Sequence, residues 1–191
     1  TEIKRKSDAA NTLRSISAGH REVFELCGQY MSRNETELKT VSPSSPRLAA
    51  LLRGRSAVAD FHRYHLLKWA EIEARALTNE AKSLVKTTDR TAAATQALNV
   101  IESALESYPV EASLIESQDL LREMLVSIKV SDWVEKAERA TFKGNYAKAR
   151  GLYRDALYYL GRDNIQNPDR DQAAEQINAE IERVMKLEND E

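Results

Sequence analysis

The chain of 191 residues is long enough for one large helical domain or two small ones with a buried core. Hydrophobic residues make up 42% of it and charged residues 30%, and 28 basic against 30 acidic side chains leave a net charge of −2. That balance gives no overall attraction to nucleic acid or to an anionic membrane, although it leaves room for a local basic patch. The single cysteine, Cys27, excludes an intrachain disulfide and suits a reducing compartment.

The start of the chain carries little targeting information. No apolar run reaches the length that crosses a bilayer, and the opening T-E-I-K-R-K is unlike a secretory signal. The chain begins at Thr1 rather than Met, which leaves open that it is part of a longer protein with a signal or an anchor upstream. We expect a cytoplasmic protein, with a periplasmic or membrane-tethered soluble region as the alternative.

The placement of proline indicates the fold class. The four prolines, Pro43, Pro46, Pro109 and Pro168, all fall where the apolar pattern breaks. Between them the sequence is rich in Ala, Leu, Glu, Lys and Arg, which lose little side-chain freedom in a helix. No segment shows sustained two-residue alternation between hairpin turn residues, so we predict an all-α protein.

Apolar and small residues spaced three and four apart predict two long N-terminal helices, one over about 3–38 and one from residue 46 toward 85. Gly54 lowers the stability of the second helix by about 1 kcal/mol relative to alanine. A break there, with Ser56 as a new helix cap, is therefore one option, and an uninterrupted helix is the other. The short connection between the two segments favours a long antiparallel helical hairpin over residues 1–77, which would tether or oligomerise the protein.

The second half of the chain shows shorter helical stripes. They predict helices over 98–108 and 111–129, and a new helix beginning at residues 131–133, where Asp132 and Glu135 are placed as a capping box.

Two later signals mark the ends of helices. Gly144 is suited to end the helix that begins at 131–133 and to start a turn. A final helix opens at Asn167-Pro168-Asp169, with a polar cap, a first-turn proline and an acid near the positive end of the helix dipole.

The segment over residues 132–160 carries small and aromatic residues at regular spacing. These are Trp133, Ala137 and Ala140 before the turn, Gly144 and Tyr146 at it, and Ala149, Tyr153 and Ala156 after it. The pattern resembles a tetratricopeptide repeat, a pair of antiparallel helices of about 34 residues. It departs from the family at three positions, because Lys136 stands where leucine is usual, Ala140 where an aromatic is frequent and Gly161 where a proline is common.

A weaker match covers residues 78–111. Its second helix fits the family at Ala97, Ile101, Ala104, Leu105 and Pro109. Ala81 replaces the tryptophan, and T-T-D-R-T replaces the glycine turn. The resemblance implies a tetratricopeptide-like array of antiparallel helices over residues 78–191, closed by a C-terminal capping helix.

Residue types that could support catalysis or metal binding are scattered. His62 and His65 lie three apart on one helix, but no third ligand is near them in sequence, and seam positions in the hairpin are the favoured interpretation. Cys27 falls on the apolar seam without an activating base, and no glycine-rich phosphate loop occurs. We therefore expect a protein that is not an enzyme and needs no metal and no cofactor.

The function implied by the resemblance is that of a protein-interaction scaffold or adaptor, which binds a peptide or helix of a partner protein in its groove. Partner-binding residues of the family line the concave face, and the matching positions are Lys82, Lys86, Val134, Glu138, Thr141 and Phe142. The alternative is a self-associating structural or regulatory region of a larger, membrane-anchored or secretion-associated protein. We expect at most a weak homodimer and no nucleic-acid partner.

Overall fold

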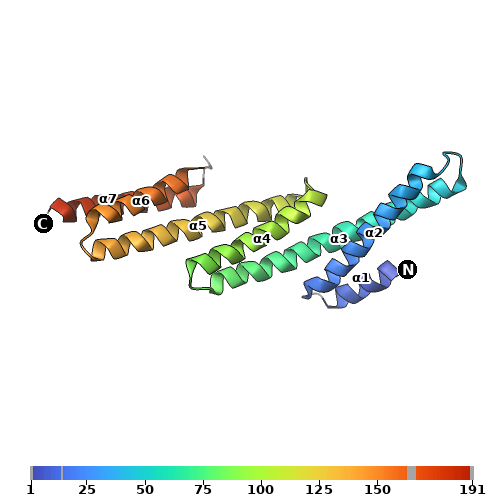
Figure 1. Ribbon diagram of the computed structural model, residues 1–191, viewed down its shortest axis with the longest axis horizontal. Coiled ribbons are helices and arrows are strands. Elements are labelled where there is room, and N and C mark those ends of the chain that lie inside the picture. Colours follow the sequence, from blue (N-terminus) through green and yellow to red (C-terminus); the bar gives the residue numbers. More distant parts are fainter. Residues whose placement is uncertain (1, 14, 163–166, 190–191) are drawn as a thin grey trace. The chain divides into compact units, whose positions relative to one another are not determined.

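The computed structural model describes residues 2–13, 15–162 and 167–189, and all regular structure within these ranges is helical (Figure 1). The predicted all-α fold is confirmed. The helices are α1 (Glu2–Thr12), α2 (Ser17–Thr40), α3 (Pro46–Ser83), α4 (Thr87–Ser107), α5 (Ala112–Phe142), α6 (Tyr146–Gly161) and α7 (Pro168–Asn189). In the described ranges, none of them combines the length and the apolar character needed to cross a bilayer.

The chain divides into two compact units. Unit 1 comprises Thr1–Asn79 and Gln96–Gln118, and unit 2 comprises Glu80–Thr95 and Asp119–Glu191. Because the cuts fall inside α3, α4 and α5, each of these helices contributes residues to both units.

In unit 1, the predicted continuous helix over 3–38 is wrong. The chain leaves the helix after α1 and starts α2 at Ser17, and α1 folds back against α2. Small residues make this close approach possible, because a Cβ added at Gly19 would lie 3.3 Å from the Cβ of buried Ala10. Lys6 also forms an ion pair with Glu22 across the two helices. The packing of α1 on α2 thus outweighs the helix-forming tendency of the residues between them.

Helices α2 and α3 of unit 1 run antiparallel. Near their connection the Asn34 amide donates a hydrogen bond to the Leu51 carbonyl over 3.1 Å, and farther from it His20 meets His65. No break occurs at Gly54, since α3 is continuous. Glycine instead makes room for a neighbouring aromatic, because a Cβ at Gly54 would lie 2.7 Å from the Tyr30 hydroxyl.

Unit 2 is built around a core shared by α5, α6 and α7. Tyr153 on α6 is fully buried in this core, together with alanines of α5 and α6 and larger apolar residues of α7. The buried members of this core are Val126, Val130, Ala137, Ala140, Ala149, Tyr153, Ala156, Leu160, Ile177 and Val184. The predicted turn after Phe142 and the predicted start of the last helix at Pro168 are both confirmed. Gly144 makes that turn with φ at +72°, a conformation that favours glycine.

The predicted new helix at residues 131–133 is wrong, because α5 continues through this segment. Asp132 does not act as a cap. Its carboxylate accepts a hydrogen bond from the Thr87 hydroxyl over 3.1 Å and pairs with Lys136 at 2.6 Å. Other side chains therefore satisfy the carboxylate of Asp132, and the helix continues through this residue. The T-T-D-R-T segment from Thr87 likewise begins α4 and is not an inter-helix turn.

The close packing of α5 and α6 can be tested by enlarging a buried alanine. We expect Ala149→Leu to lower the free energy of unfolding by roughly 1–3 kcal/mol, because the added atoms overpack a filled core. Chemical denaturation measures the loss. The matched control is Ala147→Leu, an exposed alanine in the same turn of α6, which should change stability little. Equal stabilities of the two variants would contradict the assigned packing.

A buried ion pair fixes the start of α7. Arg170 is buried, contacts the Glu123 carboxylate at 2.6 Å and donates a hydrogen bond to the Leu160 carbonyl over 3.0 Å. We expect Arg170→Met to cost about 2–4 kcal/mol, since it leaves the carboxylate and the carbonyl without this donor. Arg75→Met is the control, because its pair with Glu71 is exposed and contributes about 0–1 kcal/mol. Thermal unfolding that ranks the two variants equally would show that Arg170 does not hold α7 in place.

Candidate functional site

The predicted partner-binding residues fall into two groups within unit 2. Val134, Glu138 and Thr141 follow the three- and four-residue spacing of one face of α5, and Phe142 ends that helix with 92% of its surface exposed. Val134 is half-buried against the core, Glu138 is exposed, and the Thr141 hydroxyl donates to the Ala137 carbonyl over 3.0 Å. This face is thus held rigidly by the core behind it.

The other two predicted residues lie elsewhere. Lys82 and Lys86 are exposed at the connection between α3 and α4. Thr87, the next residue, is bound to Asp132, which lies two positions before Val134 and therefore on a different side of α5. The structure brings the four residues of α5 together, but it does not place the two lysines on their face. Partner binding by these six residues stays a prediction.

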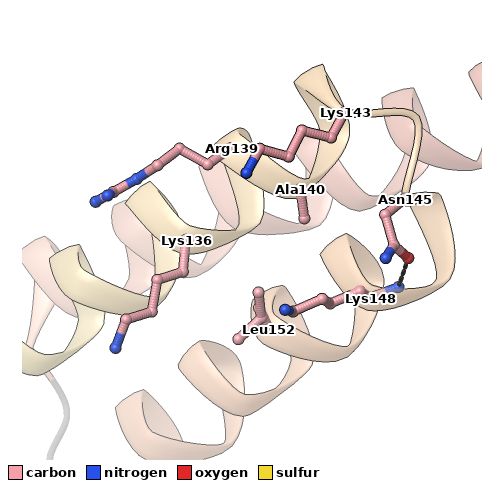
Figure 2. Close-up of a pocket in the computed structure, with 7 residues that line it drawn as sticks. All are labelled: Lys136, Arg139, Ala140, Lys143, Asn145, Lys148 and Leu152. Atoms are coloured by element: carbon pink, nitrogen blue, oxygen red, sulfur yellow. Dashed lines mark hydrogen bonds between the residues drawn. The ribbon is translucent and has the colours of Figure 1, made fainter.

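A pocket of about 410 Å³ lies on another side of α5, where this helix and α6 meet at their turn (Figure 2). It is lined by Lys136, Arg139, Ala140, Lys143, Asn145, Lys148 and Leu152, and we call it the basic pocket. Lys136 and Arg139 lie three residues apart on one side of α5, Lys143 lies in the turn after that helix, and α6 adds Lys148. Figure 2 shows Lys136 reaching from α5 toward α6, while Lys148 extends along α6 toward Leu152.

Local backbone chemistry sets the mouth of the basic pocket. The positive φ of Gly144 reverses the chain, and the Asn145 side chain then accepts a hydrogen bond from the backbone N–H of Lys148 over 3.3 Å. This bond caps α6 and satisfies one of its free N-terminal donors. The turn thereby fixes the start of α6 beside the last turn of α5.

Four cations and no acid line the basic pocket, but two of the cations already have partners. Lys136 pairs with Asp132 at 2.6 Å, and Arg139 pairs with Glu135 at 2.9 Å. The hydrogen bond from Lys136 lowers the pKa of Asp132, which keeps that pair charged. Within the described ranges, Lys143 and Lys148 have no ion-pair partner.

One sign of this pocket is visible in the sequence. Lys136 departs from the leucine that is usual in the repeat pattern, and at that position a charged side chain replaces an apolar one between two helices. Its proximity to Lys148 could not be read from spacing alone, because the two residues belong to different helices and meet only through the turn.

A second polar cluster lies inside unit 1. His20 and His65 share a hydrogen bond between their Nδ1 atoms at 2.8 Å, and His65 Nε2 lies 2.8 Å from the Ser7 hydroxyl. All three side chains are buried. His62 turns elsewhere and contacts the Tyr108 hydroxyl at 2.7 Å, so the structure does not join His62 and His65 in a ligand pair. Among the described residues, no group of three or more potential ligands could hold a metal ion.

The cluster joins all three helices of the N-terminal end, since Ser7 lies on α1, His20 on α2 and His65 on α3. A serine hydrogen-bonded to a histidine is the pair from which activated nucleophiles are built. Ser7 is only 3% exposed, so a substrate cannot reach its hydroxyl. Cys27 is also buried, and burial raises its pKa to about 11, which keeps the thiol protonated at neutral pH. These groups fit a structural role in the core of unit 1.

The buried histidines make the stability of the protein depend on pH. Burial, with His20 adding to it, lowers the pKa of His65 to about 4, whereas an unfolded histidine titrates near 6.5. Between these values the unfolded chain binds the extra proton, so stability falls as the pH drops. We expect a loss of about 2 kcal/mol between pH 7 and pH 5, measured by chemical denaturation. A His20→Leu/His65→Leu variant should lose much of this dependence, and an unchanged wild-type stability at pH 5 would contradict the assignment.

Comparison of the chain with protein-family models, with curated proteins and with solved structures finds no match.

Proposed function

We propose that the protein is an interaction scaffold, and that unit 2 binds a peptide or a helix of a partner protein. The observation that carries the proposal is the face of α5 that ends at Phe142, where a large aromatic side chain is 92% exposed on a rigid helix. Aromatic residues on such supports supply much of the binding energy of protein interfaces. The resemblance of residues 132–160 to a tetratricopeptide repeat supports the same function, because that family binds partners along this face.

The remaining features agree with a binding role. Val134 and Glu138 extend the face by two turns with an apolar and an acidic side chain. The core beneath it is formed by alanines and Tyr153, so the face keeps its shape when a partner arrives. A pre-formed surface loses little conformational entropy when a partner binds, and this favours specific recognition.

Self-association is the second candidate, and unit 1 provides the observation for it. Leu13 and Ile16, at the connection between α1 and α2, are 57% and 48% exposed. Two neighbouring apolar side chains at a helix connection can contact a second copy of the chain. This candidate would make the protein a structural element rather than an adaptor.

Site-specific crosslinking separates the two candidates. A photoreactive amino acid at position 142 should crosslink the chain to a different protein in cells that produce it, because Phe142 would lie inside the interface. The control is the same amino acid at Tyr158, an exposed aromatic of α6 away from this face, which should give no such product. The same amino acid at Leu13 should give adducts of twice the mass of the chain if unit 1 self-associates. Equal products from positions 142 and 158 would contradict the proposed face.

A further inference from the structure

We infer that the basic pocket between α5 and α6 holds an acidic segment of a partner protein, with glutamate or aspartate side chains near the lysines and an aliphatic side chain against the apolar part of the lining. The inference rests on the proposed function in that the occupant is a protein. It adds a second contact on a different side of α5, with its own chemistry.

Repulsion among the cations that line the basic pocket has an electrostatic cost. Lys136 and Arg139 lie three residues apart on α5, where like charges destabilise a helix, and Lys143 follows in the turn that leads to α6. The negative end of the α5 dipole offsets this cost for cations in its last turn. It cannot do so for Lys148, which stands in the first turn of α6, at the positive end of that helix dipole.

Lys148 therefore occupies a position that helix stability alone disfavours. The first turn of α6 contains no acidic residue, and within the described part of the chain neither Lys148 nor Lys143 has an ion-pair partner. An anion between them would relieve their repulsion and would also interact favourably with the start of α6. The fold thus leaves a site for negative charge that its own side chains do not fill.

The apolar residues in the lining of the basic pocket select the kind of anion that it can hold. Ala140 and Leu152 also line it, so part of the lining is apolar, and Figure 2 shows Lys148 beside Leu152. A volume of about 410 Å³ is much more than one carboxylate or phosphate group requires. An acidic side chain next to an aliphatic one in the same peptide would use both the charged and the apolar parts of the lining.

The same features argue against nucleic acid and against a simple phosphate site. Asp132 and Glu135 already pair with Lys136 and Arg139, so little unpaired positive charge remains for a continuous phosphate backbone. The only arginine of the lining, Arg139, is engaged by Glu135, so the two-pronged contact that arginine makes with phosphate is already in use. Lysines bind carboxylates as point charges, and the apolar part of the lining favours a peptide over a free anion.

A labelled peptide tests the inference. The probe is a fluorescein-labelled dodecapeptide of alternating glutamate and leucine, and fluorescence anisotropy measures its binding to the full chain. We expect binding that weakens at least tenfold when glutamine replaces the glutamates, and severalfold when serine replaces the leucines. Binding should also weaken as NaCl rises from about 50 to about 200 mM, because salt screens exposed charges.

Variants locate the site. Lys143→Glu/Lys148→Glu should weaken binding at least tenfold, while Lys186→Glu, an exposed lysine on α7 outside the pocket, should change it less than twofold. Circular dichroism and the thermal midpoint confirm that both variants remain folded. An equal loss in the two variants would show general attraction of charge and would overturn the pocket as the site.

Two further outcomes would overturn the inference. The first is no binding of the peptide at up to about 1 mM, which corresponds to a binding free energy weaker than about −4 kcal/mol. The second is displacement by millimolar inorganic phosphate with no dependence on the leucines, which would mark an adventitious anion site. If position 142 still crosslinks a partner protein while the peptide does not bind, the pocket inference fails and the scaffold function stands. Loss of both signals would reject both.

Discussion

The contact between α5 and α6 is the interaction on which unit 2 depends. Ala137 and Ala149 are fully buried, and their small side chains let the two helices approach closely around Tyr153. Alanine loses no side-chain entropy on burial, so the approach costs little beyond ordering of the backbone. The ring of Tyr153 then fills the space that the alanines leave, and the second helix of the pair becomes a support for α7.

In unit 1, a buried network of polar side chains holds the helices together. Ser7, His20 and His65 form a chain of hydrogen bonds through the interior, one residue from each helix. Such a network is satisfied only when the three helices are in one register, so a shift of α1 along α2 would leave buried ring nitrogens unpaired at a cost of about 1–3 kcal/mol each. The close contact of Ala10 with Gly19 fixes the same register by shape. Apolar seams alone would tolerate such shifts more readily.

Local signals allowed much of the fold to be predicted from the sequence. The turn at Gly144 and the start of α7 at Pro168 depend on the backbone properties of single residues, and both are confirmed. The break before Ser17 could not be predicted, because no proline or glycine marks it and the cause is packing of α1 on α2. Asp132 shows the opposite error. It has the sequence features of a helix cap, but Thr87, distant in sequence, supplies its partner and α5 continues.

The candidate site was less predictable for a related reason. Val134, Glu138 and Thr141 could be grouped from their spacing along one predicted helix, and all three lie on α5. The basic pocket depends on residues from two helices, and its charge depends on which cations already have partners. Lys136 and Arg139 look equivalent to Lys143 in the sequence, yet among the residues that the structure describes only the first two have an acidic partner. Charge that is available for binding is a property of the folded chain rather than of its composition.

The division of cations into paired and unpaired ones also sets the energetics of binding. Lys136 and Arg139 are held by acids one turn away, so their side chains are already partly ordered before any ligand arrives. Lys143 and Lys148 are free to reorient, and ordering each costs about 0.5–1.5 kcal/mol. The buried alanines fix the backbone of both helices. Ordering these two lysine side chains is therefore most of the conformational cost that the protein bears on binding. A site of this kind binds with modest affinity. Its selectivity comes from combining charged and apolar lining residues. A ligand that lacks either acidic or apolar groups gains only part of the interaction.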